Sequence, residues 1–246
     1  MLFSAEMVSG QHARFTTEGS IEFEKSVNMH AQIKKMINKN NETYYLPAFE
    51  QYKKSQPQFK TMKSTLSFSK DKTLYSPVAG EAAPRTFFSE LPAANQHSII
   101  YTDLSISKST AQKNVYEELF LVSDSTRKIN WKLTSETRDI AGYHCRRANA
   151  LIMDSIYVVA FYTDEIPVSG GPESFTGLPG MILGVALPHE NITWFAKIVN
   201  DKALPAGTIA PPKKGKVTTT DGLVNTLKNA LKNWGEYAQT QLKAYL

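Results

Sequence analysis

Apolar and polar residues alternate along much of the chain, in the pattern that is typical of β-strands. In the stretch 20–30, SIEFEKSVNMH, the apolar Ile21, Phe23, Val27 and Met29 fall on alternate positions. A period of two places such residues on one face of an extended strand. Comparable strand-like runs are predicted at 65–76, 98–106, 115–123, 129–168, 181–187 and 191–199.

Short turn signals separate the runs in the second half of the chain. They occur at 139–142, 153–155 and 188–191, and no helix of crossover length lies between consecutive strands. Strands joined by short turns pair with their neighbours in the chain. The sequence therefore predicts an antiparallel meander and a mainly β (α+β) fold.

Two helices are predicted outside the strands. The first is short and amphipathic, with Tyr45, Phe49 and Tyr52 at spacings of four and three, and it breaks at Pro57. The second covers 220–246, with Thr220 or Asp221 as its N-cap. We expect its apolar face to cover the sheet, and docking of this lysine-bearing helix on a membrane surface is the alternative. That face consists of Leu223, Leu227, Ala230, Leu231, Trp234, Ala238, Leu242 and Tyr245.

The chain is predicted to have four parts. Residues 1–10 are interpreted as the remnant of a signal peptide or a disordered start, because Val8-Ser9-Gly10 resembles the small-residue end of such a peptide. A β domain over 11–202 follows. A proline-rich basic linker over 203–219 then leads to the C-terminal helix at 220–246.

Composition and charge exclude several classes of protein. Of the 246 residues 41% are hydrophobic, so a core of ordinary size is expected. Cys145 is the single cysteine, which excludes an intramolecular disulfide and a multi-cysteine metal site. No apolar run approaches the ~18 residues that span a bilayer. The net charge of +5 favours anionic partners such as acidic lipid or glycan without selecting one.

The side chains that could carry metal or nucleophile chemistry are scattered. The histidines lack the spacing of a metal site, so neither a metal nor a cofactor is expected. Cys145 follows His144, but adjacent side chains of a strand point to opposite faces. We interpret the pair as a buried thiol beside an exposed imidazole and assign no catalytic residue. The histidines are His12, His30, His97, His144 and His189.

Three carboxylates offer a candidate for hydrolytic chemistry. Asp164 and Glu165 follow a strand, and Glu173 follows a Gly-Gly-Pro turn. A glycosidase needs two carboxyl groups across a cleft, whereas charged residues are also common where a strand ends in solvent. Basic residues interleave with aromatic ones around 44–63, but without a nucleic-acid motif, so no nucleic-acid partner is expected.

The stretch 175–187, FTGLPGMILGVAL, places a turn directly before an apolar strand. Gly177 and Gly180 allow positive φ, Pro179 fixes a turn, and Leu178 completes the motif. We interpret the four residues as an architectural element that leads the chain into a buried strand at 181–187.

The run from 139 to 187 resembles the defining region of the GLPGLI family of bacterial proteins. Met181 stands where the second leucine of that name is expected, and 150–153 and 185–187 also depart from the family pattern. The resemblance implies a secreted or periplasmic protein of Bacteroidota, made with a signal peptide and without a known activity. It also implies a strongly curved antiparallel sheet, a bowl or half-barrel like that of lipoprotein-carrier proteins. The matching residues are Trp131, Gly142, Tyr143, Cys145, Ala148, Phe161, Tyr162, Thr163, Glu165, Ile166, Pro167, Gly171, Pro172, Phe175, Gly177, Leu178, Pro179, Gly180, Ile182 and Leu183.

A curved sheet would present a concave apolar surface, so the leading expectation is a non-enzymatic envelope protein that binds a hydrophobic small molecule, lipid or peptide there. The expected lining residues are Trp131, Tyr143, Phe161, Met181 and Trp194. An accessory subunit that binds an outer-membrane or uptake protein is the second expectation. A hydrolase that uses Asp164, Glu165 and Glu173 is the third.

Overall fold

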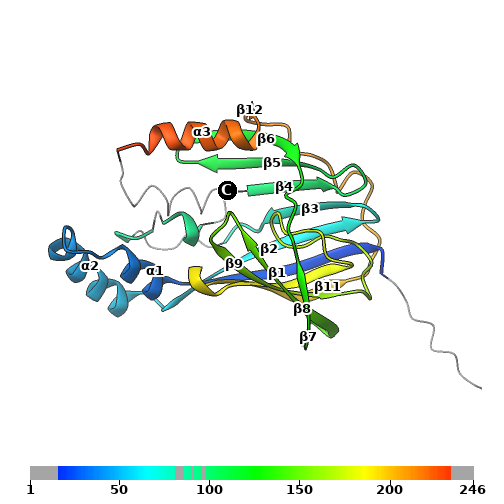
Figure 1. Ribbon diagram of the computed structural model, residues 1–246, viewed down its shortest axis with the longest axis horizontal. Coiled ribbons are helices and arrows are strands. Elements are labelled where there is room, and N and C mark those ends of the chain that lie inside the picture. The colour runs from blue at the N-terminus through cyan, green and yellow to red at the C-terminus, as the bar shows by residue number, and fades with distance from the viewer. Residues whose placement is uncertain (1–15, 81–85, 90, 96–97, 234–246) are drawn as a thin grey trace, which may run out of the picture.

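A single open sheet of twelve strands dominates the computed structural model, which describes residues 16–80, 86–89, 91–95 and 98–233 (Figure 1). Three α-helices accompany the sheet within these residues. The chain is therefore mainly β, as predicted. The strands are β1 (Glu18–Asn28), β2 (Phe59–Ser69), β3 (Lys72–Pro77), β4 (Ser98–Asp103), β5 (Lys108–Val115), β6 (Glu118–Ser125), β7 (Lys132–Ile140), β8 (Tyr143–Ile152), β9 (Ile156–Thr163), β10 (Met181–Leu187), β11 (Ile192–Asn200) and β12 (Lys216–Thr218). The helices are α1 (Met29–Met36), α2 (Glu42–Ser55) and α3 (Thr220–Ala230).

Two consecutive meanders make up the sheet. The strand order is β12-β6-β5-β4-β3-β2-β1-β11-β10-β9-β8-β7, so β1–β6 form one meander and β7–β11 the other. They meet where β1 pairs antiparallel with β11, from Ser20 opposite Asn200 to Val27 opposite Ile192. The short β12 pairs parallel with β6, whereas every other pairing is antiparallel.

The connection between the meanders requires the sheet to bend. Six residues, 126–131, join β6 to β7 and span at most about 25 Å from Ser125 to Lys132. β6 and β7 are ten steps apart in the strand order, which corresponds to about 48 Å in a flat sheet. In agreement, the Arg138 guanidinium of β7 lies 4.8 Å from the ring centroid of Phe195 of β11, across three intervening strands.

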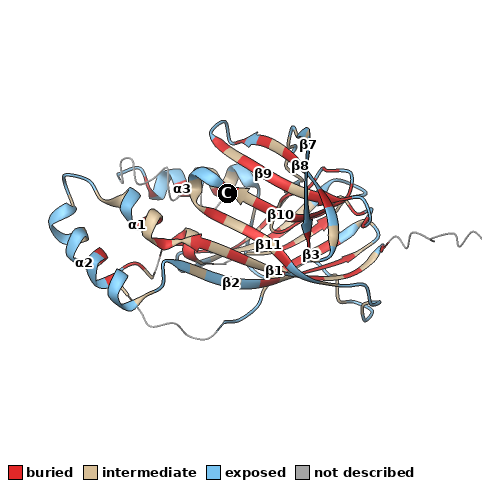
Figure 2. Ribbon diagram, turned by 90° about the horizontal axis from the view of Figure 1, so that it is seen from below, coloured by how far each residue is buried: buried red, intermediate tan, exposed pale blue. Residues whose placement is uncertain are grey.

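The core lies on the face of the sheet that carries Ile21, Phe23 and Val27 of β1, which is called the core face below. Buried residues concentrate in β9, β10, β11 and β1, whereas α2 is mostly exposed (Figure 2). Met29 was predicted on the first strand but begins α1. The reason is local, because the side chain of Asn28 accepts a hydrogen bond from the Ala31 amide and so caps the helix.

α2 confirms the first predicted helix and ends directly before Pro57, with Gln56 as its C-cap. Pro47 lies inside it, and Phe49 and Tyr52 are its buried residues. The sequence pattern missed α1, because the strand-like alternation of β1 continues into it as far as Met29.

The C-terminal helix is confirmed over Thr220–Ala230. Its N-cap is Thr219, one residue before the predicted candidates, and the Thr219 hydroxyl accepts from the Gly222 amide at 3.1 Å. Leu223, Leu227 and Leu231 are buried against the rest of the chain. The three leucines of the described part of the helix are therefore covered by its own domain, whereas Trp234, Ala238, Leu242 and Tyr245 lie outside the described residues.

The predicted signal remnant at 1–10 and the last part of the predicted C-terminal helix, 234–246, lie outside the described residues. None of the helices within the described ranges is long and apolar enough to cross a membrane.

Candidate functional site

The site is organised by the segment 164–180, which is called the motif loop here and joins β9 to β10. Its apolar residues Ile166, Val168 and Leu178 are almost completely buried. The loop runs beside the start of β10, because the Met181 amide donates to the Ile166 carbonyl at 3.0 Å and the Ile182 amide donates to Gly170 at 2.8 Å. The loop is thus part of the core rather than a surface excursion.

Two glycines set the path of the motif loop. Gly177 and Gly180 have φ of 93° and 144°, in the region that favours glycine. A Cβ at Gly180 would lie 2.1 Å from the carbonyl oxygen of Thr163, which belongs to the backbone of β9. The close approach of two backbone segments at Gly180 leaves no room for any side chain.

Trp131 covers the motif loop. Its indole Nε1 donates to the carbonyl of Thr176 at 2.9 Å, and a Cβ at Gly177 would lie 3.6 Å from the same nitrogen. Because Trp131 is half-buried and its indole nitrogen bonds to the loop, it holds the motif loop in place.

Trp194 contacts the same loop from the core face. Its Nε1 donates to Glu173 Oε1 at 3.1 Å, and its ring packs edge-on against Phe175 at 6.1 Å. Lys25 lies opposite Trp194 in the β1–β11 register. The Lys25 ammonium is 5.1 Å from the Trp194 ring centroid and 3.7 Å from Glu173 Oε1, and it donates to the Asn95 carbonyl at 3.2 Å.

Two buried hydroxyls extend this arrangement across the sheet. Ser64 of β2 is 1% exposed and Tyr75 of β3 is 2% exposed. Neither hydroxyl makes a hydrogen bond of good geometry to any residue that the structure describes. Burial raises the pKa of Tyr75 well above its usual value, the charge of Glu173 adds to this effect, and the nearby side chains of Ser64 and Trp194 partly oppose it. Lys25, Ser64, Tyr75, Glu173 and Trp194 are together called the polar cluster.

Positive charge gathers around the single carboxylate of the cluster. Burial lowers the pKa of Lys25, and the charge of Glu173 opposes this effect. Burial also lowers the pKa of Lys113 of β5 to about 8, where Glu173 again acts to raise it and Arg127 to lower it. Lysines with lowered pKa values near a partner charge are common at functional sites, although structural ion pairs produce the same effect.

The five residues expected to line an apolar surface do not share one. Met181 and Trp194 are buried, and Trp131 is occupied with the motif loop. Phe161 points away from the core face, because its neighbours Ala160 and Tyr162 point towards it. Its ring lies 6.5 Å from that of Phe195 and 5.8 Å from the guanidinium of Arg138. Tyr143 is half-buried at the start of β8.

The three carboxylates considered for hydrolysis each contact a different group. Asp164 is exposed and pairs with Arg146 at 2.6 Å. Glu165 accepts from the amide of His144 at 3.2 Å, and Glu173 faces Lys25. Each of the three carboxylates therefore has a different partner.

Cys145 and His144 also face different surroundings. Cys145 is buried, and burial, followed by the charge of Glu165, raises the pKa of its thiol to about 12. His144 is exposed beside Asp139 at 3.1 Å. A thiol with so high a pKa is a poor nucleophile. Within the described part of the chain, no three His, Cys, Asp or Glu side chains are grouped so that they could hold a metal ion.

Of the polar cluster, Glu173 and Trp194 were predicted as candidate site residues in other roles, whereas Lys25, Ser64 and Tyr75 were missed. Lys25 occupies an inward position in the alternation of β1, between Phe23 and Val27, and this was the available signal. Ser64, Tyr75 and Glu173 carry no comparable local signal, because their proximity depends on strand pairing and on the path of the motif loop.

The motif loop lies within the stretch of the chain that matches a known family model. A family model described as "Protein of unknown function (Porph_ging)" matches residues 151–184, from the end of β8 to β10. No curated protein matches the chain.

Solved structures show a likeness of fold. PNGF-II in two crystal forms, P21 and C2, is 18% and 17% identical, with a TM-score of 0.51 in each case and 88% of this chain covered. The present chain spans about a third of the PNGF-II chain, 34% and 33%. An uncharacterized conserved protein from Thermus thermophilus aligns at 4% identity and a TM-score of 0.39, over 84% of this chain and 92% of its own.

Proposed function

We propose that the chain is a non-enzymatic binding protein of the cell envelope, whose ligand contacts the polar cluster on the core face. The observation that carries this proposal is the pair of buried hydroxyls on Ser64 and Tyr75, which lie near each other but make no hydrogen bond of good geometry with any described residue. They lie in the same cluster as the buried ammonium of Lys25.

A folded chain rarely leaves such groups unsatisfied. Burying a hydroxyl without a partner costs roughly 1–3 kcal/mol, and apolar residues of similar size would avoid that cost. Unsatisfied polar groups in a native core therefore need an explanation, and a bound acceptor is one. Two hydroxyl donors and an ammonium suit a ligand that carries a carboxylate or another hydrogen-bond acceptor.

The surroundings of the cluster indicate the rest of the ligand. Phe23 lies opposite Ser64, and Leu66 and Ile100 lie opposite Tyr75 on the two sides of β3. An amphiphile or peptide with a polar head and an apolar body matches such a combination. This refines the expectation of a purely hydrophobic ligand.

Shape and location belong to the same proposal. The bend of the sheet is compatible with a bowl or half-barrel of the lipoprotein-carrier type. The resemblance of 139–187 to the GLPGLI family supports a secreted or periplasmic location in Bacteroidota.

Native mass spectrometry of the protein, purified gently from its own envelope fraction, tests the proposal. We expect a bound mass in the range of a lipid or peptide. Tyr75→Phe and Ser64→Ala should lose that mass while unfolding with equal or higher free energy, by up to about 1 kcal/mol, because each removes an unsatisfied hydroxyl. Tyr162→Phe is the control, since it removes a tyrosine hydroxyl from another almost fully buried position.

Three results would contradict the proposal. One is a wild-type protein without any bound small molecule. Another is retention of the bound mass in both cluster variants, and the last is its loss in the Tyr162→Phe control. Recovery of a bound protein instead of a small molecule would favour the accessory-subunit alternative.

A further inference from the structure

The helical end of the chain carries an excess of positive charge. Residues 29–63 contain seven lysines and two glutamates, which gives +5, the whole net charge of the protein. The remaining 21 basic (28 − 7) and 21 acidic (23 − 2) residues cancel. A second segment, 202–232, also has an excess of basic residues, with six lysines and one aspartate.

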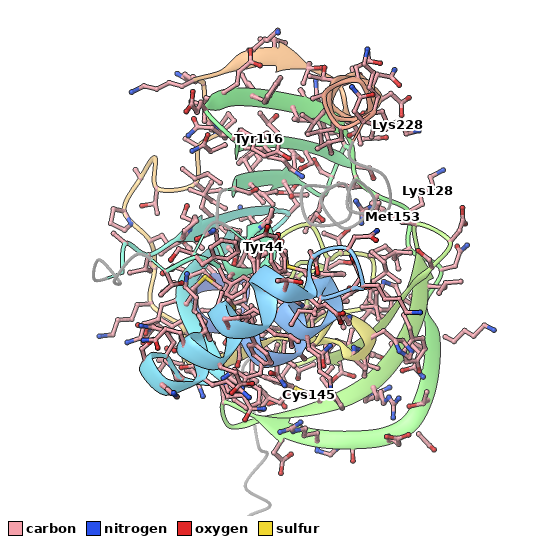
Figure 3. The ribbon with its side chains drawn as sticks, turned by 90° about the vertical axis from the view of Figure 1, so that its left-hand side faces the viewer. Tyr44, Tyr116, Lys128, Cys145, Met153 and Lys228 are labelled. Carbon is pink, nitrogen blue, oxygen red and sulfur yellow. The ribbon has the colours of Figure 1, made fainter. Side chains whose placement is uncertain are left out.

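The first charged segment projects from the sheet. α1 and α2 lie beyond the end of β1 and β2 at one extremity of the molecule (Figure 1). Viewed from that side, the two helices face the viewer, and Tyr44 lies on α2 (Figure 3). Aromatic contacts hold α2 in place, because His30 packs edge-on against Phe49 at 5.7 Å, and Tyr52 against Phe88 at 6.0 Å.

Three apolar side chains of the helical end are exposed. Tyr44 is 75% exposed and Leu46, also on α2, is 45% exposed. Phe87 is 65% exposed and packs edge-on against Tyr45 of the same helix at 5.4 Å. Exposed aromatic and aliphatic residues beside lysines are typical of segments that lie in the interface of a bilayer.

The kind of basic residue distinguishes a charged surface from a specific anion site. All seven basic residues of 29–63 are lysines, whereas the arginines of the chain lie elsewhere. Arginine binds a single carboxylate, phosphate or sulfate through two parallel hydrogen bonds, and lysine acts as a mobile point charge. Lysines without arginine therefore favour a field of many anions, such as a lipid surface, over one acidic sugar or peptide.

We infer that the helical end, formed by α1, α2 and Phe87, docks on the surface of an anionic lipid bilayer. In this arrangement Lys34, Lys39 and Lys54, all exposed, lie near the headgroups, and Tyr44, Leu46 and Phe87 enter the interface. The two remaining lysines of the helical region are partly occupied, since Lys35 pairs with Glu190 and Lys53 with Glu50. This inference is independent of the ligand proposed for the polar cluster.

Vesicle flotation of the full chain tests it, with phosphatidylcholine vesicles that contain or lack phosphatidylglycerol. We expect binding only to the anionic vesicles, and its loss between about 0.1 M and about 1 M salt, as the Debye length falls from about 10 Å to about 3 Å. A lysine near such a surface contributes roughly fivefold to binding, so the triple variant Lys34→Gln, Lys39→Gln, Lys54→Gln should bind at least about tenfold more weakly.

Matched variants test whether binding depends on the helical end or only on the total positive charge of the protein. The triple variant Lys202→Gln, Lys213→Gln, Lys214→Gln removes the same charge from the exposed segment between β11 and β12, and it should bind like the wild type. Tyr44→Ser with Leu46→Ser should weaken binding. Ile106→Ser with Val217→Ser, which are also exposed positions, should not.

The inference is overturned if the wild type ignores anionic vesicles, or if the two lysine variants weaken binding equally. It is also overturned if an acidic polysaccharide binds the helical end while anionic vesicles do not.

Discussion

At Gly180, the carbonyl of Thr163 occupies the space that a methyl group would need. Gly180→Ala should therefore lower the free energy of unfolding by about 4 kcal/mol or more, because steric overlap adds to a strained φ. Gly177→Ala has the strained φ but only ordinary contact with Trp131, so about 1–2 kcal/mol is expected. Gly80→Ala, with no atom within 4 Å of its Cβ, serves as the control. Urea unfolding measures the series, and equal losses at Gly180 and Gly177 would refute the steric argument.

Cys145 should be unreactive in the folded protein. With a thiol pKa raised to about 12 by burial, only about one molecule in ten thousand carries the thiolate at pH 8. Ellman's reagent should therefore label Cys145 slowly in buffer and at once in denaturant. Rapid labelling of the native protein would show that the thiol is accessible after all.

At the scale of single residues, the sequence predicted the placement of a side chain wherever that placement depends on neighbouring residues in the chain. The alternation of Ile21, Phe23 and Val27 predicted their common face, and the Gly-Leu-Pro-Gly run predicted a turn before a buried strand. Glu173 is different, because it lies 148 positions (173 − 25) from its partner Lys25. No pattern within either segment could have indicated that contact.

At the scale of elements, the Lys25–Glu173 contact ties β1 to the motif loop. Glu173→Gln should lower the free energy of unfolding by about 2 kcal/mol, less than for a fully buried pair because Glu173 is 30% exposed. Adding Lys25→Met should recover most of that loss, since the unpaired buried ammonium is then gone. Thermal and urea unfolding of the single and double variants measure the coupling.

A matched control uses the residue next to Lys25 in β1 and its partner in β11. Glu24 of β1 pairs with Lys197 of β11 at 3.1 Å, but both side chains are substantially exposed. Glu24→Gln should change the free energy of unfolding by no more than about 0.5 kcal/mol. If Glu24→Gln and Glu173→Gln lower the free energy of unfolding equally, burial does not make the Lys25–Glu173 pair more stabilising than an exposed pair.

The elements themselves were predicted unevenly. Strands with one buried face showed a clear period of two, and β7, at the edge of the sheet, was also predicted within the run 129–168 although it is mostly exposed. α1 escaped notice because its eight residues follow a strand without a break and hold only three buried side chains. The pairing of β1 with β11 and the parallel addition of β12 depend on contacts far apart in sequence.

At the scale of the whole molecule, Lys113 should make stability depend on pH. Its pKa is lowered to about 8 from an ordinary 10.5, so between these values the unfolded chain binds a proton that the folded chain lacks. The free energy of unfolding therefore gains a contribution that rises with pH across this window. Below about pH 8, Lys113 is charged in the folded chain, and burying this charge lowers the free energy of unfolding by about 1–2 kcal/mol. This figure is smaller than the full pKa shift implies, because the side chain is only half-buried.

Lys113→Met removes this contribution. The variant should be the more stable protein at pH 7, and its advantage should shrink as the pH rises from about 8 to about 10.5. Urea unfolding of both proteins at several pH values gives the difference between their free energies of unfolding. The contributions of the tyrosines and of Cys145 cancel in this difference, because these groups are present in both proteins. A difference that stays constant over the window would mean that the Lys113 pKa is not lowered.

The junction between the two meanders also fixes the order of events while the chain is being made. Val27 must wait for Ile192, which emerges from the ribosome 165 residues (192 − 27) later. At about 5–20 residues per second, one side of β1 lacks its partner for roughly 8–33 s in each nascent chain. During that interval the unpaired amides and carbonyls of β1 can bond to neighbouring nascent chains. The risk of aggregation is therefore set by the density of ribosomes on one messenger RNA more than by the stability of the folded protein.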